Sequence, residues 1–263
     1  MLPSLSVTVL GIASGSLVGF TLGLVGGGGS ILAVPLLVYL VGVPNPHVAI
    51  GTSAIAVAAN AAANLVGHHR VGNVIWPCAL LFAVAGVAGA FLGSTIGKAV
   101  DGQKLLAAFA VLMMAVAALM LRGRSAAAGK TVEFTPAMAP QLILIGLGTG
   151  TLSGFFGIGG GFLIVPGLML ATGMPILNAV GSSLVAVTAF GATTAASYAI
   201  SGKVDWVIAG LFLCGGVLGG LIGTRAAHAL ASRRGYLNAT FATLIFAVAV
   251  YMLVRSLQAV WAA

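Results

Sequence analysis

Residues 23–36 read GLVGGGGSILAVPL and residues 154–167 read GFFGIGGGFLIVPG, so a glycine cluster followed by Val-Pro occurs twice in this chain. From position 23 to position 154 the offset is 131 residues, and six glycines of the first half, between positions 15 and 29, have partners at this offset. They are Gly15, Gly19, Gly23, Gly26, Gly28 and Gly29, which fall on Gly146, Gly150, Gly154, Gly157, Gly159 and Gly160.

The correspondence also includes residues that glycine-rich composition would not match by chance. Pro44 falls on Pro175 at the offset of 131, and Trp76 falls on Trp206 after a slip to an offset of 130. Internal self-similarity at a fixed offset indicates a repeated structural unit. We therefore predict two homologous repeats, residues 1–121 and 141–263, joined by a connecting loop over residues 122–140.

The composition places both repeats in a membrane. Of the 263 residues, 60% are hydrophobic and 5% are charged, whereas about a quarter are charged in soluble domains. The net charge of +8 comes from basic residues scattered singly between apolar runs. A nucleic-acid-binding protein gathers them on one face, so no nucleic-acid partner is expected. We predict an all-α polytopic protein of the bacterial inner membrane, with the lipid bilayer as its surroundings.

Prolines, charges and glycine clusters divide the chain into ten apolar segments. These are 5–25, 31–42, 48–66, 75–97, 104–121, 141–156, 162–173, 179–200, 206–230 and 236–254. A helix needs about 20 residues to cross the hydrocarbon core, and two segments at matching places, 31–42 and 162–173, are shorter than that. Secondary transporters place such broken helices at the substrate site between their repeats.

The basic residues bear on whether the repeats are parallel or inverted. If all ten segments cross, loop Lys and Arg residues divide seven against four between the two sides, and the richer side is cytoplasmic. If each short segment joins its neighbour, eight crossings remain and the division is five against six. The ten-segment, inverted arrangement is therefore the preferred one.

The paired glycine cluster and Val-Pro motif resembles the signature of the sulfite exporter TauE/SafE family of membrane permeases. The resemblance extends over nearly the whole chain, since the duplicated architecture is shared. It implies a carrier for sulfite or an organosulfonate and leaves the choice among small oxyanions open. The alternatives are a passive anion channel and a non-transporting membrane assembly subunit.

The glycine clusters are the first candidates for binding an anion. A helix that begins within the membrane exposes unpaired N–H groups and the positive end of its dipole, and glycine lets an anion approach them. Close helix packing and a sharp turn are the alternative role. The candidate residues are Gly26, Gly27, Gly28, Gly29, Ser30, Gly157, Gly159, Gly160 and Gly161.

Polar residues in the apolar segments are the second group of candidates. Hydroxyls at matching places in the halves either cap helix starts or donate to an oxyanion; they belong to Thr52, Ser53, Ser182 and Ser183. Asn60 and Asn64 lie one turn apart and either line the pathway or bond to a neighbouring helix. Arg225 either faces inward or reaches to lipid headgroups.

The acidic residues indicate the sign of the cargo. Asp101, Glu133 and Asp205 all fall in or beside predicted loops, so no carboxylate is placed mid-membrane to bind a cation. Protons, if they are coupled, must use a histidine or travel on the substrate. No catalytic triad, phosphate-binding motif or metal-ligand spacing is present, so we expect no enzyme activity, no cofactor and no metal. The sequence holds no signal for an oligomeric state.

Overall fold

The computed structural model describes residues 4–122, 134–229 and 234–261, and this part of the chain is helical with no strand. The helices are α1 (Leu5–Val25), α3 (Pro46–Arg70), α4 (Trp76–Ala99), α5 (Gly102–Arg122), α6 (Ala139–Phe156), α7 (Gly161–Thr172), α8 (Ile176–Ile200), α9 (Trp206–Ala229) and α10 (Arg234–Trp261). A 3₁₀ turn, Pro136–Met138, precedes α6. Most of the predicted connecting loop, residues 123–133, lies outside the described residues.

Seven helices of the described chain are long and apolar enough to cross a membrane. Large hydrophobic side chains such as Leu144, Leu170 and Ile200 project outward, with Ile200 88% exposed. A surface of this kind is compatible with lipid and not with water. The prediction of an all-α, multi-pass membrane protein is confirmed.

The first short segment is wound differently from the prediction. Instead of one helix over 31–42, the chain forms a 3₁₀ helix over Gly26–Leu32, a single turn named α2 over Ala33–Pro35, and a π-helical stretch over Leu36–Val41. Four consecutive glycines favour no regular helix, and Pro35 donates no backbone hydrogen bond. The second short segment is a regular helix, α7, of 12 residues.

Glycines on α1 and α9 let these two helices pack backbone against backbone. A Cβ atom added at Gly15 would overlap the backbone of Phe212, and one at Gly19 would overlap the backbone of Gly216. The contact moves from Gly15 to Gly19 on α1 as it moves from Phe212 to Gly216 on α9, so the two helices are parallel. Close glycine-mediated crossings of this kind are common in membrane helices.

The α4–α6 pair repeats this arrangement. A Cβ at Gly150 would overlap the backbone of Gly86, and one at Gly154 the backbone of Ala90. These contacts correspond to those of Gly19 and Gly23 at the offset of 131, with α4 and α6 also parallel. The glycines that recur every four residues on α1 and α6 therefore serve close helix packing, the alternative role named above.

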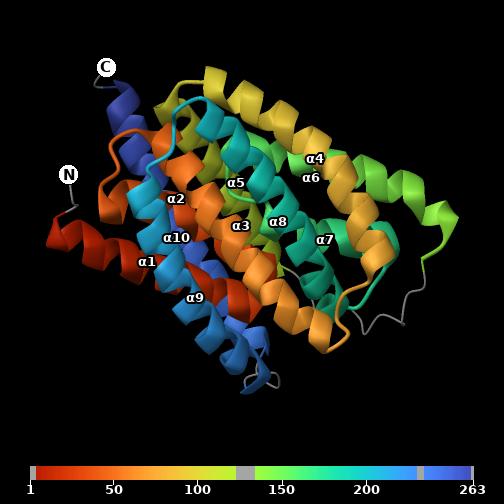
Figure 1. Ribbon diagram of the computed structural model, residues 1–263. Helices are drawn as coiled ribbons and strands as arrows, with labels where there is room; N and C mark the ends of the chain where they lie inside the picture. The colour runs from red at the N-terminus through yellow and green to blue at the C-terminus, as the bar shows by residue number, and fades with distance from the viewer. Residues whose placement is uncertain (1–3, 123–133, 230–233, 262–263) are drawn as a thin grey trace.

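Helices α3 and α8 lie between the two pairs (Figure 1) and run antiparallel. A Cβ at Gly51 would lie 2.8 Å from the Tyr198 Cβ, and one at Gly191 would lie 3.0 Å from the Ala58 Cβ, so positions rise on one helix as they fall on the other. α3 is parallel to α9, and α8 is parallel to α4, by the same kind of contact.

These directions fix how the chain runs. α1 and α3 both run parallel to α9, so the segment from Gly26 to Val41 must carry the chain back between them. α6 runs parallel to α4 and therefore opposite to α1. α1 begins and α10 ends on the same side of the bundle (Figure 1).

Candidate substrate site at the helix breaks

The second helix break consists of three glycines with left-handed backbone. Gly157, Gly159 and Gly160 have φ of 70°, 66° and 66°, values that L side chains rarely adopt. Gly157 ends α6 by donating its N–H to the Ser153 carbonyl at 2.8 Å. Gly160 opens α7, and its carbonyl accepts from the Leu163 and Ile164 N–H groups. Glycine at these positions is required by the backbone itself.

This break lies against the central helix pair and is closed in this conformation. A Cβ at Gly159 would lie 2.9 Å from Val57 of α3 and 3.3 Å from Val187 of α8, two valines that correspond at the offset of 130. A Cβ at Gly157 would overlap Ile50. An anion can reach the backbone of Gly159 only if this contact with α3 and α8 opens.

The first break folds back on the end of α1. The Thr21 hydroxyl is 3.4 Å from the Gly29 carbonyl oxygen and donates to the Val18 carbonyl at 2.9 Å. A Cβ at Gly29 would overlap the backbone of Leu22, and Ser30 is buried. The surroundings of Gly26, Gly27 and Gly28 lie outside the described part of the structure.

Polar groups without hydrogen-bond partners among the described residues lie in the core. Asn60 is fully buried, and neither atom of its amide has a hydrogen-bond partner among the described residues. It is the fifteenth of the 25 residues of α3, near the middle of the bundle, and a Cβ at Gly216 would overlap its amide nitrogen. The hydroxyls of Ser153, Thr194 and Tyr198 are equally buried and unpartnered within the described chain.

Such groups are costly to retain. Each buried, unpaired donor or acceptor costs about 1–3 kcal/mol, and native proteins keep few of them. Ser153 adjoins the second glycine break directly, because a Cβ at Gly160 would lie 2.6 Å from the Ser153 Cβ. Asn60 therefore supplies unused hydrogen-bonding capacity near the middle of the bundle, and Ser153 supplies it beside the second break. Tyr198 lies near the end of α8, against His47 and Lys98.

Thr52 and Ser182, by contrast, are used within the protein. The Asp205 N–H donates to the Thr52 hydroxyl at 3.0 Å, and the Ile75 N–H donates to the Ser182 hydroxyl at 2.9 Å. The two bonds correspond at the offset of 130, since Thr52 falls on Ser182 and Ile75 falls on Asp205. Each hydroxyl binds the residue just before α9 or α4, so it holds the start of a helix that belongs to the other half of the chain.

Ser53 and Ser183 bond within their own helices. Their hydroxyls donate to the Ile50 carbonyl at 3.0 Å and to the Val180 carbonyl at 2.7 Å. All four predicted hydroxyls are thus engaged in this conformation, and the contacts of Thr52 and Ser182 resemble the capping alternative.

This difference predicts unequal effects of removing neighbouring hydroxyls. Ser182→Ala leaves the partly buried Ile75 N–H without this acceptor, and we expect it to lower the free energy of unfolding by about 1–2 kcal/mol. Ser183→Ala removes a bond within one helix turn and should change stability by less than about 0.5 kcal/mol. Thermal unfolding of both variants in detergent measures the difference, and equal melting temperatures would contradict the assigned role.

Asn64 and Arg225 lie farther from the centre. The Thr224 hydroxyl is 3.4 Å from the Asn64 side-chain oxygen and donates to the Gly220 carbonyl at 2.8 Å, so Asn64 contacts a neighbouring helix. Arg225 is exposed on α9, as the headgroup alternative requires. The structure therefore places Asn60 one helical turn after Val57, which contacts the second break, and leaves Arg225 outside this group.

Sequence reasoning missed Ser153, Thr194 and Tyr198. Thr194 had a signal available, because it corresponds to Asn64 at the offset of 130. Ser153 had none, because its counterpart is Leu22. Among the described residues, no group of three or more His, Cys, Asp or Glu side chains is placed to hold a metal ion.

Comparison with known proteins supplies independent information. The family model described as Sulfite exporter TauE/SafE matches residues 11–252. A "Probable membrane transporter protein" of Xylella fastidiosa (strain 9a5c) is 53% identical over 94% of this chain and 95% of its own length. The "Probable membrane transporter protein YunE" of Bacillus subtilis (strain 168) is 29% identical over 82% and 86%. No solved structure matches the chain significantly.

Proposed function

We propose that this chain, which belongs to the sulfite exporter TauE/SafE family, carries sulfite or an organosulfonate across the bacterial inner membrane by alternating access. It is a multi-pass membrane transporter by its family and its apolar helices. The substrate and the mechanism are the proposal. The observation that carries it is the buried amide of Asn60, which lies near the middle of the bundle and has no hydrogen-bond partner among the described residues.

The position of the acids favours an anion as cargo. Asp101 accepts from the Gln103 and Lys104 N–H groups at the start of α5, each at 3.1 Å. Asp205 accepts from the Val207 and Ile208 N–H groups at the start of α9, each at 3.0 Å. Both carboxylates lie at helix starts, where the dipole favours them. Asn60 and the buried hydroxyls can donate to an oxyanion without bringing a charge of their own.

Inverted repeats would supply the motion. The reciprocal bonds of Thr52 and Ser182, and the opposite directions of α1 and α6, support two repeats of inverted topology. In such carriers the site lies between the repeats and opens alternately to each side. The contact of Gly159 with Val57 and Val187 would close the site in the present conformation and part when it opens.

Uptake into proteoliposomes tests the substrate. We expect saturable uptake of labelled sulfite, or of a small sulfonate such as methanesulfonate, and no uptake by liposomes without protein. A set of oxyanions that includes sulfate and phosphate establishes selectivity. Failure to move any small oxyanion, with protein that is folded by its melting curve, would reject the proposed cargo.

A further inference from the structure

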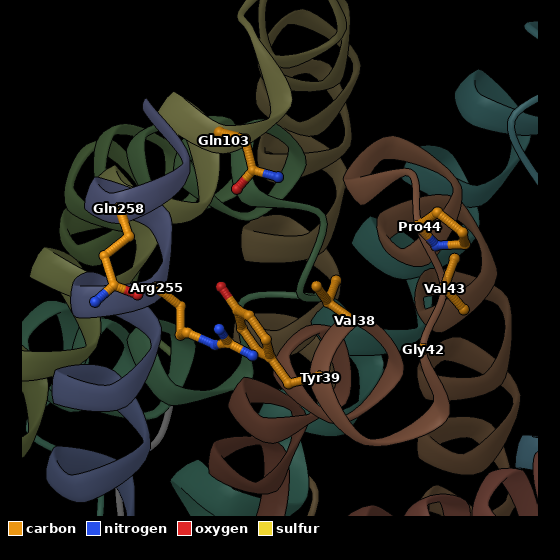
Figure 2. Close-up of a pocket in the computed structure, with 8 residues that line it drawn as sticks. All are labelled: Val38, Tyr39, Gly42, Val43, Pro44, Gln103, Arg255 and Gln258. Carbon is orange, nitrogen blue, oxygen red and sulfur yellow. The ribbon is translucent and has the colours of Figure 1, made fainter. Parts of the chain in front are cut away.

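A depression of about 470 Å³, lined by both apolar and polar residues, lies where the Leu36–Val41 stretch, the start of α5 and the end of α10 meet. Figure 2 shows Gln103, Arg255 and Gln258 around it, with the Tyr39 side chain next to Arg255. This is the side of the bundle on which α1 begins and α10 ends. The depression is separate from Asn60 and from the second glycine break.

The guanidinium of Arg255 is the charge at this site. Its Nε donates to the Tyr251 hydroxyl at 3.3 Å, and its central carbon lies 5.9 Å from the centre of the Tyr251 ring. No ion pair with a carboxylate of the described residues neutralises it. A guanidinium has five N–H donors arranged to bind two oxygens of one oxyanion, so most of its donor capacity remains free.

The other polar side chains complete an anion-binding set. The amides of Gln103 and Gln258 add N–H donors from α5 and α10, and neither carries a negative charge that would repel an oxyanion. An adjoining depression of about 420 Å³ shares Pro44 and Gln103 and contains Asp101. That carboxylate already accepts two backbone N–H groups, which offset part of its charge.

The wall formed by Tyr39 links the depression to the first helix break. The Tyr39 hydroxyl lies 3.3 Å from the Ser256 hydroxyl of α10, and the Tyr39 and Tyr251 rings meet edge to face at 5.4 Å. Tyr39 belongs to the returning segment that begins at Gly26. At the offset of 131 its counterpart is Leu170, which is 78% exposed. The tyrosine wall thus has no equivalent at α7.

We propose that this depression is a capture site for the transported oxyanion on one side of the membrane, with Arg255 as its main ligand. The identity of the anion rests on the proposed function, whereas the existence of the site rests on the depression and on the Arg255 guanidinium, which has no ion-pair partner among the described residues. Arg255 binds two oxygens of the sulfite or sulfonate group, and Gln103 and Gln258 donate to it from either side. An anionic phospholipid headgroup offers similar chemistry and is separated from the free anion by the experiment below.

Binding and uptake are measured on the full-length protein with Arg255→Ala, Arg255→Lys and the control Lys104→Ala. Lys104 is exposed in the first turn of α5 but does not line the depression. Titration of sulfite and methanesulfonate in phospholipid-free detergent should show about tenfold weaker binding for Arg255→Ala, as loss of a charge-assisted pair implies. Arg255→Lys should fall between, and Lys104→Ala should match the wild type. In proteoliposomes KM should rise for Arg255→Ala with little change in the maximal rate.

The outcomes separate this proposal from the proposed function. Transport by the wild type together with unchanged binding and KM in Arg255→Ala would overturn the capture site alone. Anion binding that depends on Arg255 in a wild type that transports nothing would retain the site and reject the carrier. Unchanged anion binding, with an anionic phospholipid that copurifies with the wild type but not with Arg255→Ala in mass spectra, would assign the site to lipid and overturn the proposal.

Discussion

Gly150→Ala should lower the free energy of unfolding by about 3 kcal/mol, the upper part of the range for overpacking a tight contact. The added methyl group would overlap the carbonyl oxygen, the carbonyl carbon and the Cα atom of Gly86. Backbone cannot rotate aside as a side chain can, so α4 and α6 must separate. Their separation would loosen one of the two glycine-packed pairs that flank α3 and α8.

The control lies two residues away in the same helix. A Cβ at Gly148 meets nothing within 4 Å, so Gly148→Ala makes the same chemical change on the exposed face of α6. It should leave stability unchanged or raise it slightly, since alanine favours helix over glycine. Thermal unfolding in one detergent compares the two variants.

The corresponding position in the other half gives a second comparison. Gly19→Ala would overlap the backbone of Gly216 just as Gly150→Ala overlaps that of Gly86, so its effect should be of similar size. Melting temperatures that do not distinguish Gly150→Ala from Gly148→Ala would show that the α4–α6 crossing is less tight than the structure has it.

Much of this architecture could be predicted because its signals are local. Apolar run length gave the helix boundaries to within a few residues at most positions, and the four-residue spacing of Gly15, Gly19 and Gly23 indicated close crossings. The 3₁₀ and π winding between Gly26 and Val41 could not be predicted, because a glycine run allows many backbone conformations and the packing against α1 selects one of them.

The candidate site was harder to predict because it depends on contacts distant in sequence. Nothing near Thr52 or Ser182 in the chain indicates that each binds a helix start in the other half. The direction of Arg225 was equally undetermined, because α9 is apolar around most of its circumference and has no polar face to orient it. For Asn60, the residue and its burial in an apolar helix could be predicted, and the structure shows that its amide has no hydrogen-bond partner among the described residues.

Asn60→Leu should slow transport about 10-fold or more while leaving the protein at least as stable as the wild type. Leucine has the same branching of heavy atoms as asparagine, and it removes a buried amide whose lack of partners costs about 1–3 kcal/mol. If that amide donates to the passing oxyanion, its loss should slow transport about 10-fold or more, since a hydrogen bond to a charged group contributes about 1.5–3 kcal/mol. If Asn60 served only the structure, its replacement would not slow transport while leaving stability unchanged or higher.

Thr193→Val is the matched control for Asn60→Leu. It too replaces a polar side chain by an apolar one of similar shape in a central helix, but the Thr193 hydroxyl donates at 2.8 Å to the Ala189 carbonyl of its own helix. We expect its transport rate and its melting temperature to stay close to those of the wild type. An equal loss of transport in Thr193→Val and Asn60→Leu would contradict a specific role of Asn60 in transport.

Counterflow in proteoliposomes tests the central claim, a carrier whose substrate passes Asn60. Vesicles loaded with unlabelled sulfite are diluted into a trace of labelled sulfite, and the label inside is followed with time. The wild type and Thr193→Val should accumulate label transiently above its equilibrium level. Asn60→Leu should show a much slower and smaller overshoot, with a melting temperature no lower than that of the wild type. A wild type without overshoot would indicate a channel, and an undiminished overshoot in Asn60→Leu would contradict a substrate path through the centre of α3.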